Sequence, residues 1–252
     1  MSGTDHAKHT NSHGRQPAII LVAPQMGENI GAAARAMWNF GLHRLRLVNP
    51  RDGWPNSRAV AMASGAASVL DAVRVCADTN EALADLHHVY ATTARIRDLT
   101  KAVVPPEAAM RDARARIRAG ENVGFLFGPE RAGLENADIV RAGTLVSVPV
   151  NPAFGSLNLA QCVLLLAYEW QQSRDAVDLR ETPDKDRAAN GAEVEKLYEN
   201  LRDRLADAGF FWPADKADSM ALNLRNLLSR LPLTGSDVRM LHGVVKALAK
   251  KS

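Results

Sequence analysis

The sequence places amide and charged side chains next to glycines in several short segments. The first, Asn29-Ile-Gly-Ala-Ala-Ala-Arg35, follows the apolar run 18–22. Its small residues would let a helix lie close to a neighbouring element, with Asn29 as the N-cap, Arg35 nearly two turns along and Gly41 at the helix end. Taken alone, the segment is typical of a well-capped packing helix with a surface arginine, and a ligand site is the less favoured interpretation.

A second segment, Phe125-Leu-Phe-Gly128-Pro-Glu130-Arg131, ends an apolar run with a glycine, a proline and a charged pair. Open α/β sheets bind ligands beyond the carboxyl ends of their strands, and Gly128 would allow a ligand to approach the backbone. A plain tight turn would not need Glu130 or Arg131. A ligand site and a structural turn explain this segment equally well.

A third segment, Val148-Pro-Val-Asn151-Pro-Ala-Phe-Gly155-Ser156-Leu157-Asn158, links another apolar run to a helix that should end near Trp170. Its prolines would fix the loop, and Ser156 is expected to cap the helix. An ordinary capped helix accounts for all of this except Asn158, an amide in the first turn. A fourth and weaker segment, Tyr90-Ala-Thr92-Thr93-Ala94-Arg95, ends a strand-like run in a polar loop.

Short β-type runs alternate with helical stretches over the first two thirds of the chain. This alternation predicts an α/β fold with a mostly parallel sheet that helices cover on both faces. The strands are expected at residues 18–22, 45–48, 73–75, 88–91, 123–127 and 145–148.

The chain is expected to divide into four parts. Residues 1–16 are polar and rich in histidine, which predicts a disordered tail, and residues 17–172 form the α/β domain. The almost wholly polar residues 173–191 predict a linker, and residues 192–252 a small helical C-terminal extension. Its helices are expected at 193–208, 215–230 and 236–250, with Ser236 as the N-cap of the last one.

The composition is that of an ordinary water-soluble protein. No apolar run approaches the roughly 20 residues that span a bilayer, and the polar N-terminus lacks the apolar core of a signal peptide, so we expect a cytoplasmic location and no membrane partner. Cys76 and Cys162 lie far apart without further Cys or His at metal-ligand spacing, so we expect two buried thiols, no disulfide and no metal site. The net charge of +3 permits nucleic-acid binding without indicating it.

Together, the four segments resemble the motifs of the SPOUT-class RNA ribose 2′-O-methyltransferases, in their TrmH-like group. The order is diagnostic: an Asn-to-Arg helix, a Phe-Gly-x-Glu-Arg turn, and Asn-Pro-x-x-x-Ser-Leu-Asn at the start of the last core helix. The resemblance covers roughly residues 18–170, and the C-terminal segment also resembles the helical extension of some members. It implies a SPOUT fold whose last strand and helix form a deep trefoil knot, a rare feature among folds.

The resemblance implies that the knot loops bind S-adenosylmethionine as the methyl donor, mostly through backbone groups, and that no metal takes part. The matching positions are Thr92, Thr93, Ala94, Gly128, Val148, Gly155, Ser156 and Leu157. The main catalytic role at the ribose hydroxyl falls to Arg35, with Asn29, Glu130, Ser156 and Asn158 as supporting residues. Because a guanidinium is a poor proton acceptor, Arg35 either accepts the proton in a special environment or positions the hydroxyl and a flanking phosphate.

The resemblance further implies a homodimer whose active sites take residues from both subunits. It also implies tRNA as the substrate, with cytidine or uridine at position 32 of the anticodon loop as the target. Two alternatives stay open: the same reaction on ribosomal RNA or at another tRNA position, and a non-catalytic RNA-binding protein with this fold.

Several basic residues are candidates for contacts with RNA phosphates. Arg111, Arg114 and Arg118 share one face of an expected helix and would reach phosphates. A solvated face with a Glu107–Arg111 ion pair is the favoured interpretation. The C-terminal segment adds Arg225, Arg230, Lys250 and Lys251 as further candidates.

Overall fold

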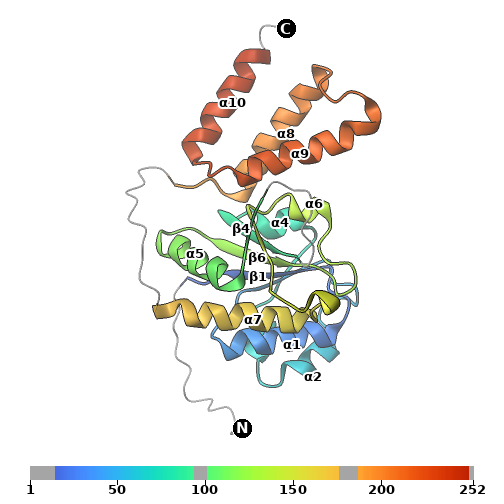
Figure 1. The fold of residues 1–252 in the computed structure, drawn as a ribbon, viewed down its shortest axis with the longest axis vertical. Helices are drawn as coiled ribbons and strands as arrows, with labels where there is room; N and C mark the ends of the chain where they lie inside the picture. The colour runs from blue at the N-terminus through green and yellow to red at the C-terminus, as the bar shows by residue number, and fades with distance from the viewer. Residues whose placement is uncertain (1–14, 94–100, 176–186, 250–252) are drawn as a thin grey trace.

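The computed structural model describes residues 15–93, 101–175 and 187–249. Within them, seven parallel strands form one sheet in the order β3-β2-β1-β6-β4-β7-β5 (Figure 1). The strands are β1 (Ala18–Val22), β2 (Leu45–Val48), β3 (Arg74–Cys76), β4 (His88–Thr92), β5 (Ala102–Val104), β6 (Val123–Phe127) and β7 (Thr144–Val146). The α/β class and the parallel sheet that the sequence predicts are confirmed.

Helices cover both faces of the sheet, as predicted (Figure 1). The shorter α4 (Thr79–Leu83) and α6 (Asn136–Ile139) pack on one face. On the other face, apolar side chains of five helices share a core with the strands: α1 (Gly27–Asn39), α2 (Ser57–Ala63), α3 (Ala67–Asp71), α5 (Pro106–Arg118) and α7 (Leu159–Gln172). Strands β1 and β6 are buried along their whole length, as expected of central strands between two helical layers.

The edge strand β5 is the one described strand that the sequence does not predict. Its three residues are exposed or half-buried, and they pair with β7. An edge strand of this length shows neither the apolar run nor the alternation that distinguishes a strand from a loop. The expected strands all form, with ends shifted by one or two residues at β3, β4 and β7.

Strand β7 lies between β4 and β5, although it follows both in the chain. It pairs with β4 on one side and with β5 on the other. The link between β4 and β5 would have to pass around β7 to close a knot, and residues 94–100 of this link lie outside the described part. The strand order is therefore consistent with the trefoil knot, which stays a prediction.

Asn29 and Ser156 are not the N-caps that the sequence predicts. Helix α1 begins two residues before Asn29, whose side chain bonds to other loops rather than to its own helix. Asn158 caps α7 in place of Ser156, because its Oδ1 accepts hydrogen bonds from the backbone N–H groups of Ala160 and Gln161 at 2.9 and 3.4 Å. The structural role of Asn158, which the sequence alone does not explain, is thus to cap α7.

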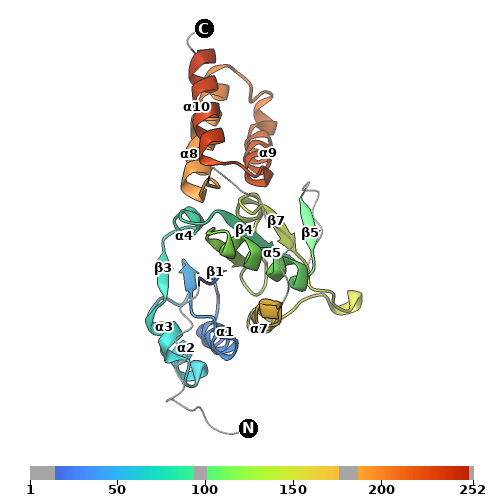
Figure 2. The ribbon, with the colours of Figure 1, turned by 90° about the vertical axis from the view of Figure 1, so that its left-hand side faces the viewer.

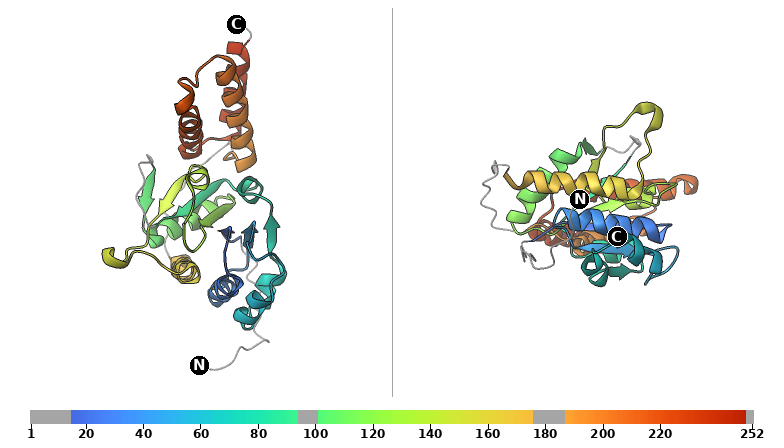
Figure 3. Two further views of the ribbon diagram at one scale, coloured as in Figure 1. Left: turned by 90° about the vertical axis from the view of Figure 1, so that its right-hand side faces the viewer. Right: turned by 90° about the horizontal axis from the view of Figure 1, so that it is seen from below.

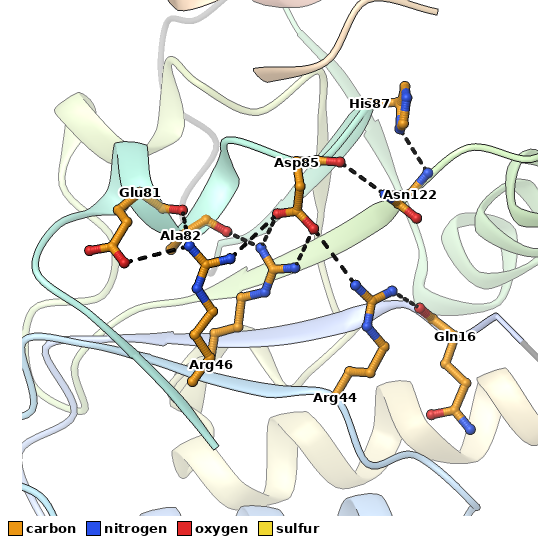
Figure 4. Close-up of polar contacts among 9 residues, drawn as sticks. Gln16, Arg44, Arg46, Glu81, Ala82, Asp85, His87 and Asn122 are labelled. Atoms are coloured by element: carbon orange, nitrogen blue, oxygen red, sulfur yellow. Dashed lines mark hydrogen bonds and ion pairs between the residues drawn. The ribbon is translucent and has the colours of Figure 1, made fainter. Parts of the chain in front are cut away.

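A buried arginine fixes β2 to the segment between α4 and β4 (Figure 4). The Arg46 guanidinium donates hydrogen bonds of 2.6 and 2.8 Å to the Asp85 carboxylate and one of 2.5 Å to the carbonyl of Ala82. Burial tends to raise the pKa of Asp85, but the hydrogen bonds and positive charge of Arg46, aided by Arg44, outweigh burial and lower that pKa. This cluster lies near the amino end of β2, and we interpret its role as structural.

An extension of three helices lies beyond the α4 face of the sheet (Figures 1 and 2): α8 (Gly191–Asp207), α9 (Ala217–Arg230) and α10 (Gly235–Ala249). Its small core centres on Leu197, Tyr198 and Leu228. The predicted helices are present with shifted ends. Ser236 is not the N-cap of α10, because Thr234 and Asp237 exchange hydrogen bonds there. The boundaries 17–172, 173–191 and 192–252 stay a prediction.

Candidate active site

A cavity of about 400 Å³ opens at the carboxyl edge of the sheet, where β4, β6 and β7 end. We call it the carboxyl-edge cavity. Its walls come from three segments that lie far apart in the sequence, within residues 92–93, 127–134 and 146–162. They meet because neighbouring parallel strands end at the same edge of a sheet. The volume falls in the range of about 300–1,000 Å³ that is typical of small-ligand sites.

The carboxyl-edge cavity gathers the residues that the family resemblance assigns to the cofactor. The Thr92 hydroxyl donates to the Leu126 carbonyl and the Thr93 N–H to the Val146 carbonyl, both at 2.9 Å, so the end of β4 is tied to its two neighbours. Ala94 lies outside the described residues. The predicted cofactor residues that line the cavity are Thr92, Thr93, Gly128, Val148, Gly155, Ser156 and Leu157. What each of them binds stays a prediction.

Gly128 is required by the chain itself. A Cβ at this position would lie 2.2 Å from the backbone nitrogen of Leu134 and 2.3 Å from the carbonyl carbon of Gly133. Both distances are far inside van der Waals contact, and both atoms belong to backbone. The turn after β6 therefore folds back over Gly128 in a way that any side chain would prevent. Ligand access, the reason that the sequence suggests for this glycine, is at most part of the explanation.

Glu130 joins two loops at the rim of the carboxyl-edge cavity. Its carboxylate accepts hydrogen bonds from the Gln25 N–H at 2.8 Å, the Met26 N–H at 3.3 Å and the Asn29 side-chain amide at 2.7 Å. The Asn158 amide donates to Asn29 Oδ1 at 3.0 Å. The structure thus brings together Asn29, Glu130 and Asn158, which lie up to 129 positions apart in the chain. Ser156 lines the cavity beside them.

Arg35 lies outside this cluster. Its side chain is exposed on α1 and is not part of the cavity lining. No hydrogen bond or ion pair joins it to any residue that the structure describes. Within one chain, the structure therefore does not bring the predicted catalytic arginine to the carboxyl-edge cavity.

Cys162 belongs to the cavity lining, although the sequence predicts it only as a buried thiol. It is half-buried, whereas Cys76 is buried as predicted. Burial raises the pKa of Cys162 to about 12, so the thiol stays neutral and acts as a small apolar wall. The available signal was its spacing from Asn158, since residues four apart share one face of a helix.

Several of the candidate RNA-binding arginines make contacts within the chain. Arg111 pairs with Glu107 at 3.2 Å, as the favoured interpretation had it. Arg114 stacks on the Trp170 ring at 3.7 Å and donates to the Ser173 hydroxyl at 2.8 Å.

Arg225 stacks on the Tyr198 ring at 3.9 Å and pairs with Glu195. Arg114 and Arg225 thus have packing roles in α5 and α9, and a contact of either with RNA stays a prediction. Lys250 and Lys251 lie outside the described residues.

A larger cavity, of about 920 Å³, lies between the sheet and the C-terminal extension. None of the predicted catalytic or cofactor-binding residues line it, whereas Arg225 and Arg230, two of the candidate RNA contacts, do. Lys101 lies there and donates to the Ala142 carbonyl and, at 3.0 Å, to the Ser229 hydroxyl of α9. Burial, followed by the charge of Arg230, lowers the pKa of Lys101 to about 8. These contacts tie the extension to the sheet, so we interpret this space as a junction between two parts of the protein.

Within residues 15–93, 101–175 and 187–249, no group of three or more His, Cys, Asp or Glu side chains is arranged to hold a metal ion. No helix there combines the length and the apolar character needed to cross a bilayer.

Sequence and structure comparisons relate the chain to known proteins. The model of the SpoU rRNA methylase family matches residues 16–168. The tRNA (cytidine/uridine/adenosine-2′-O-)-methyltransferase TrmJ of Pseudomonas aeruginosa is 34% identical over 241 residues, which cover 92% of this chain and 93% of that protein. The crystal structure of TrmJ from Z. mobilis ZM4 is 48% identical, with a TM-score of 0.84, and covers 93% of this chain and 99% of its own. The chain belongs to the SpoU rRNA methylase family.

Proposed function

We propose that the protein is an S-adenosylmethionine-dependent tRNA ribose 2′-O-methyltransferase that acts on cytidine or uridine at position 32 of the anticodon loop. The observation that carries the proposal is the carboxyl-edge cavity, where the separate motif segments meet beside Asn29, Glu130 and Asn158. The names of the matched relatives support tRNA over ribosomal RNA as the substrate. Position 32 rests on the family resemblance alone.

The carboxyl-edge cavity suits a methyl donor that carries a nucleoside. Its walls combine apolar side chains, such as Val148, Leu157 and Leu159, with the backbone of two glycine-containing loops. A nucleobase needs apolar contacts on its faces and hydrogen-bonding groups at its edge, and loop backbone can supply the latter. Bound there, S-adenosylmethionine would supply an electrophilic methyl group on its sulfonium.

The protein's own residues must hold the ribose 2′-hydroxyl in line with that methyl group and manage one proton. Asn29 and Asn158 lie at the cavity rim in orientations that Glu130 and their mutual hydrogen bond fix, so they are placed to orient the ribose. Arg35 acts through position and charge at the hydroxyl and a flanking phosphate. In this mechanism the guanidinium acts only as a hydrogen-bond donor, and the ribose oxygen releases its proton to water after methyl transfer.

The proposed enzyme is a homodimer in which Arg35 of one protomer serves the cavity of its partner. Helix α7 lies beside α1 (Figure 3) and exposes an apolar stripe of Leu164, Leu165 and Tyr168, each 38 to 45% accessible. The opposite face of α7 is already buried in the core. A second apolar stripe on such a helix indicates a further contact surface, and a second copy of the chain would cover it.

Mixing two inactive variants tests the reaction and the dimer together. We expect Arg35→Ala and Asn158→Ala each to lose most single-turnover tRNA methylation. If Arg35 acts across the dimer, an equal mixture forms about one half heterodimers, and one of their two sites is intact, so about a quarter of wild-type activity returns. If Arg35 acts within its own chain, the mixture stays inactive. Arg58→Ala, an exposed arginine of α2, is the control and should stay active.

Two measurements distinguish the proposed function from the alternatives. Calorimetry that detects no S-adenosylmethionine binding would favour a non-catalytic RNA-binding protein. The second measurement maps 2′-O-methyl groups in tRNA and ribosomal RNA from cells with and without the gene. We expect the methyl group at position 32 of tRNA to be lost without the gene. Loss at another tRNA nucleotide or in ribosomal RNA would instead favour that nucleotide or that RNA as the target. We place the reaction in the cytoplasm, where tRNA is found.

A further inference from the structure

The turn after β6 carries both of the charged side chains that line the carboxyl-edge cavity, Glu130 and Arg131. The Glu130 carboxylate is already engaged, because it accepts hydrogen bonds from Gln25, Met26 and Asn29 around the start of α1. Arg131 is exposed, and no hydrogen bond or ion pair joins its side chain to any residue that the structure describes. The cavity therefore presents one positive charge that these residues leave unpaired.

The backbone holds Arg131 in place at the rim of the cavity. The Gly133 N–H donates to the Pro129 carbonyl at 2.9 Å, which closes the turn around Arg131. Gly133 has a φ of +67°, which glycine adopts without strain, and Leu134 fixes the end of the turn in the core with 3% exposure. The preceding residue, Glu130, is tied to the start of α1. A ligand of Arg131 would thus cost side-chain freedom alone, because the turn is already ordered.

The guanidinium group of Arg131 is suited to an oxyanion. Its planar fork of N–H donors matches two oxygens of a phosphate or a carboxylate. Two oxyanions would come to this cavity under the proposed function: a phosphate of the RNA backbone and the carboxylate of the methyl donor.

The location of Arg131 favours the phosphate. It follows Glu130, whose carboxylate orients Asn29, and Asn29 in turn accepts from Asn158, at the rim where the proposed mechanism places the ribose. RNA must approach from this exposed side, whereas the methyl donor would lie between the loops inside the cavity. Every ribose within an RNA chain has a phosphate on each side, and the proposed mechanism assigns one of the two to Arg35.

We propose that Arg131 binds the second phosphate, on the opposite side of the target ribose from the one assigned to Arg35. The inference rests on the proposed function and deepens it. Phosphates held on both sides of the ribose fix its rotation, so that the 2′-hydroxyl faces the methyl group. Contacts with phosphates do not depend on the base. This mode of binding therefore suits a site that accepts cytidine and uridine alike.

Single-turnover methylation of tRNA by the full chain tests the contact. Arg131→Ala should raise the half-saturating tRNA concentration by about tenfold to a hundredfold, the effect of one hydrogen bond to a charged group. The slope of log affinity against log salt concentration should fall by about 0.7, the share of one phosphate in a single strand. Arg131→Lys keeps the charge without the fork, so it should retain the slope and recover only part of the affinity. Calorimetry without RNA should give an unchanged affinity for S-adenosylmethionine.

The control for charge is Arg74→Ala. Arg74 is also exposed, but it lies on the edge strand β3, with three strands between it and the nearer cavity strand β4 or two before β6. This variant should keep both the tRNA affinity and the salt slope of the wild type.

A tRNA with one neutral methylphosphonate linkage locates the phosphate. Placed on either side of the target nucleotide in turn, the linkage should weaken binding to the wild type in both positions. Arg131→Ala should lose its sensitivity to one of these positions and keep it at the other, as expected when a substitution and a modification remove the same contact.

Three results would overturn the inference. One is an Arg131→Ala variant with the tRNA affinity and salt slope of the wild type. Another is a loss of S-adenosylmethionine affinity with unchanged tRNA affinity, which would assign Arg131 to the carboxylate of the methyl donor. The third is a lower thermal midpoint with equal losses for both ligands, which would show that Arg131 stabilises the turn. A wild-type protein that methylates no tRNA would instead refute the proposed function, and the inference with it.

Discussion

Replacing Glu130 by glutamine tests whether this carboxylate acts by positioning two loops. In the wild type, one oxygen accepts from Gln25 and the other from Met26 and Asn29. A glutamine keeps one acceptor oxygen and turns an NH₂ group toward the remaining donor, so the better of its two orientations loses one charge-assisted hydrogen bond. Such a bond contributes about 1.5–3 kcal/mol, and we take about 2 kcal/mol for this half-buried site.

If that free energy is lost in the transition state, the single-turnover rate falls about thirtyfold. The same loss should lower the thermal midpoint by about 4–8 °C. The assay is methyl transfer to tRNA at saturating S-adenosylmethionine, with differential scanning fluorimetry in parallel. The control is Glu135→Gln, an exposed glutamate whose side chain makes no capping hydrogen bond at α6.

A rate within about threefold of the wild type would refute the positioning argument for Glu130. A fall in the single-turnover rate of more than about a thousandfold, with an unchanged thermal midpoint, would also contradict a positioning role, because general-base catalysis contributes on that scale. The carboxylate would then take the proton itself.

Three further substitutions probe other parts of the structure. Gly128→Ala should abolish S-adenosylmethionine binding, because its Cβ would clash with backbone; normal calorimetric affinity would show that the turn can move. Asp85→Ala should cost about 3 kcal/mol in urea unfolding, since it leaves the buried Arg46 guanidinium without its carboxylate, and a cost under about 1 kcal/mol would contradict this. Hydrogen bonding by Arg187 lowers the pKa of Glu193 from 4.5 to about 2. The stability that the ionised Glu193 contributes is therefore fully present above pH 4.5 and is lost as the pH falls through 2. The stability gap between wild type and Glu193→Gln should shrink over that pH range in urea titrations, and a constant gap would exclude this linkage.

The sequence predicts the sheet and most of the cavity for a common physical reason. Apolar runs mark the central strands, and turns with glycine, proline and polar residues mark their carboxyl ends, which a parallel sheet gathers at one edge. The sequence does not predict β5, whose short exposed pattern equals that of a loop. It also misplaces the cap of α7, because Ser156 and Asn158 are both good capping residues and only the loop geometry selects between them.

The direction of the Arg35 side chain relative to that of Asn29 follows from helix geometry. It bears on how two copies of the chain would share an active site. Asn29 is fixed at both ends of its amide, since its nitrogen donates to Glu130 and its oxygen accepts from Asn158. Arg35 comes six residues later on the same helix, about 9 Å along the axis and rotated by about 240°. The two side chains therefore leave the helix about 120° apart, in agreement with the exposed position of Arg35 outside the cavity lining. If both act in methyl transfer, as the family motifs imply, this geometry supports the proposal that Arg35 acts in the cavity of a second copy of the chain rather than in the one that Asn29 borders.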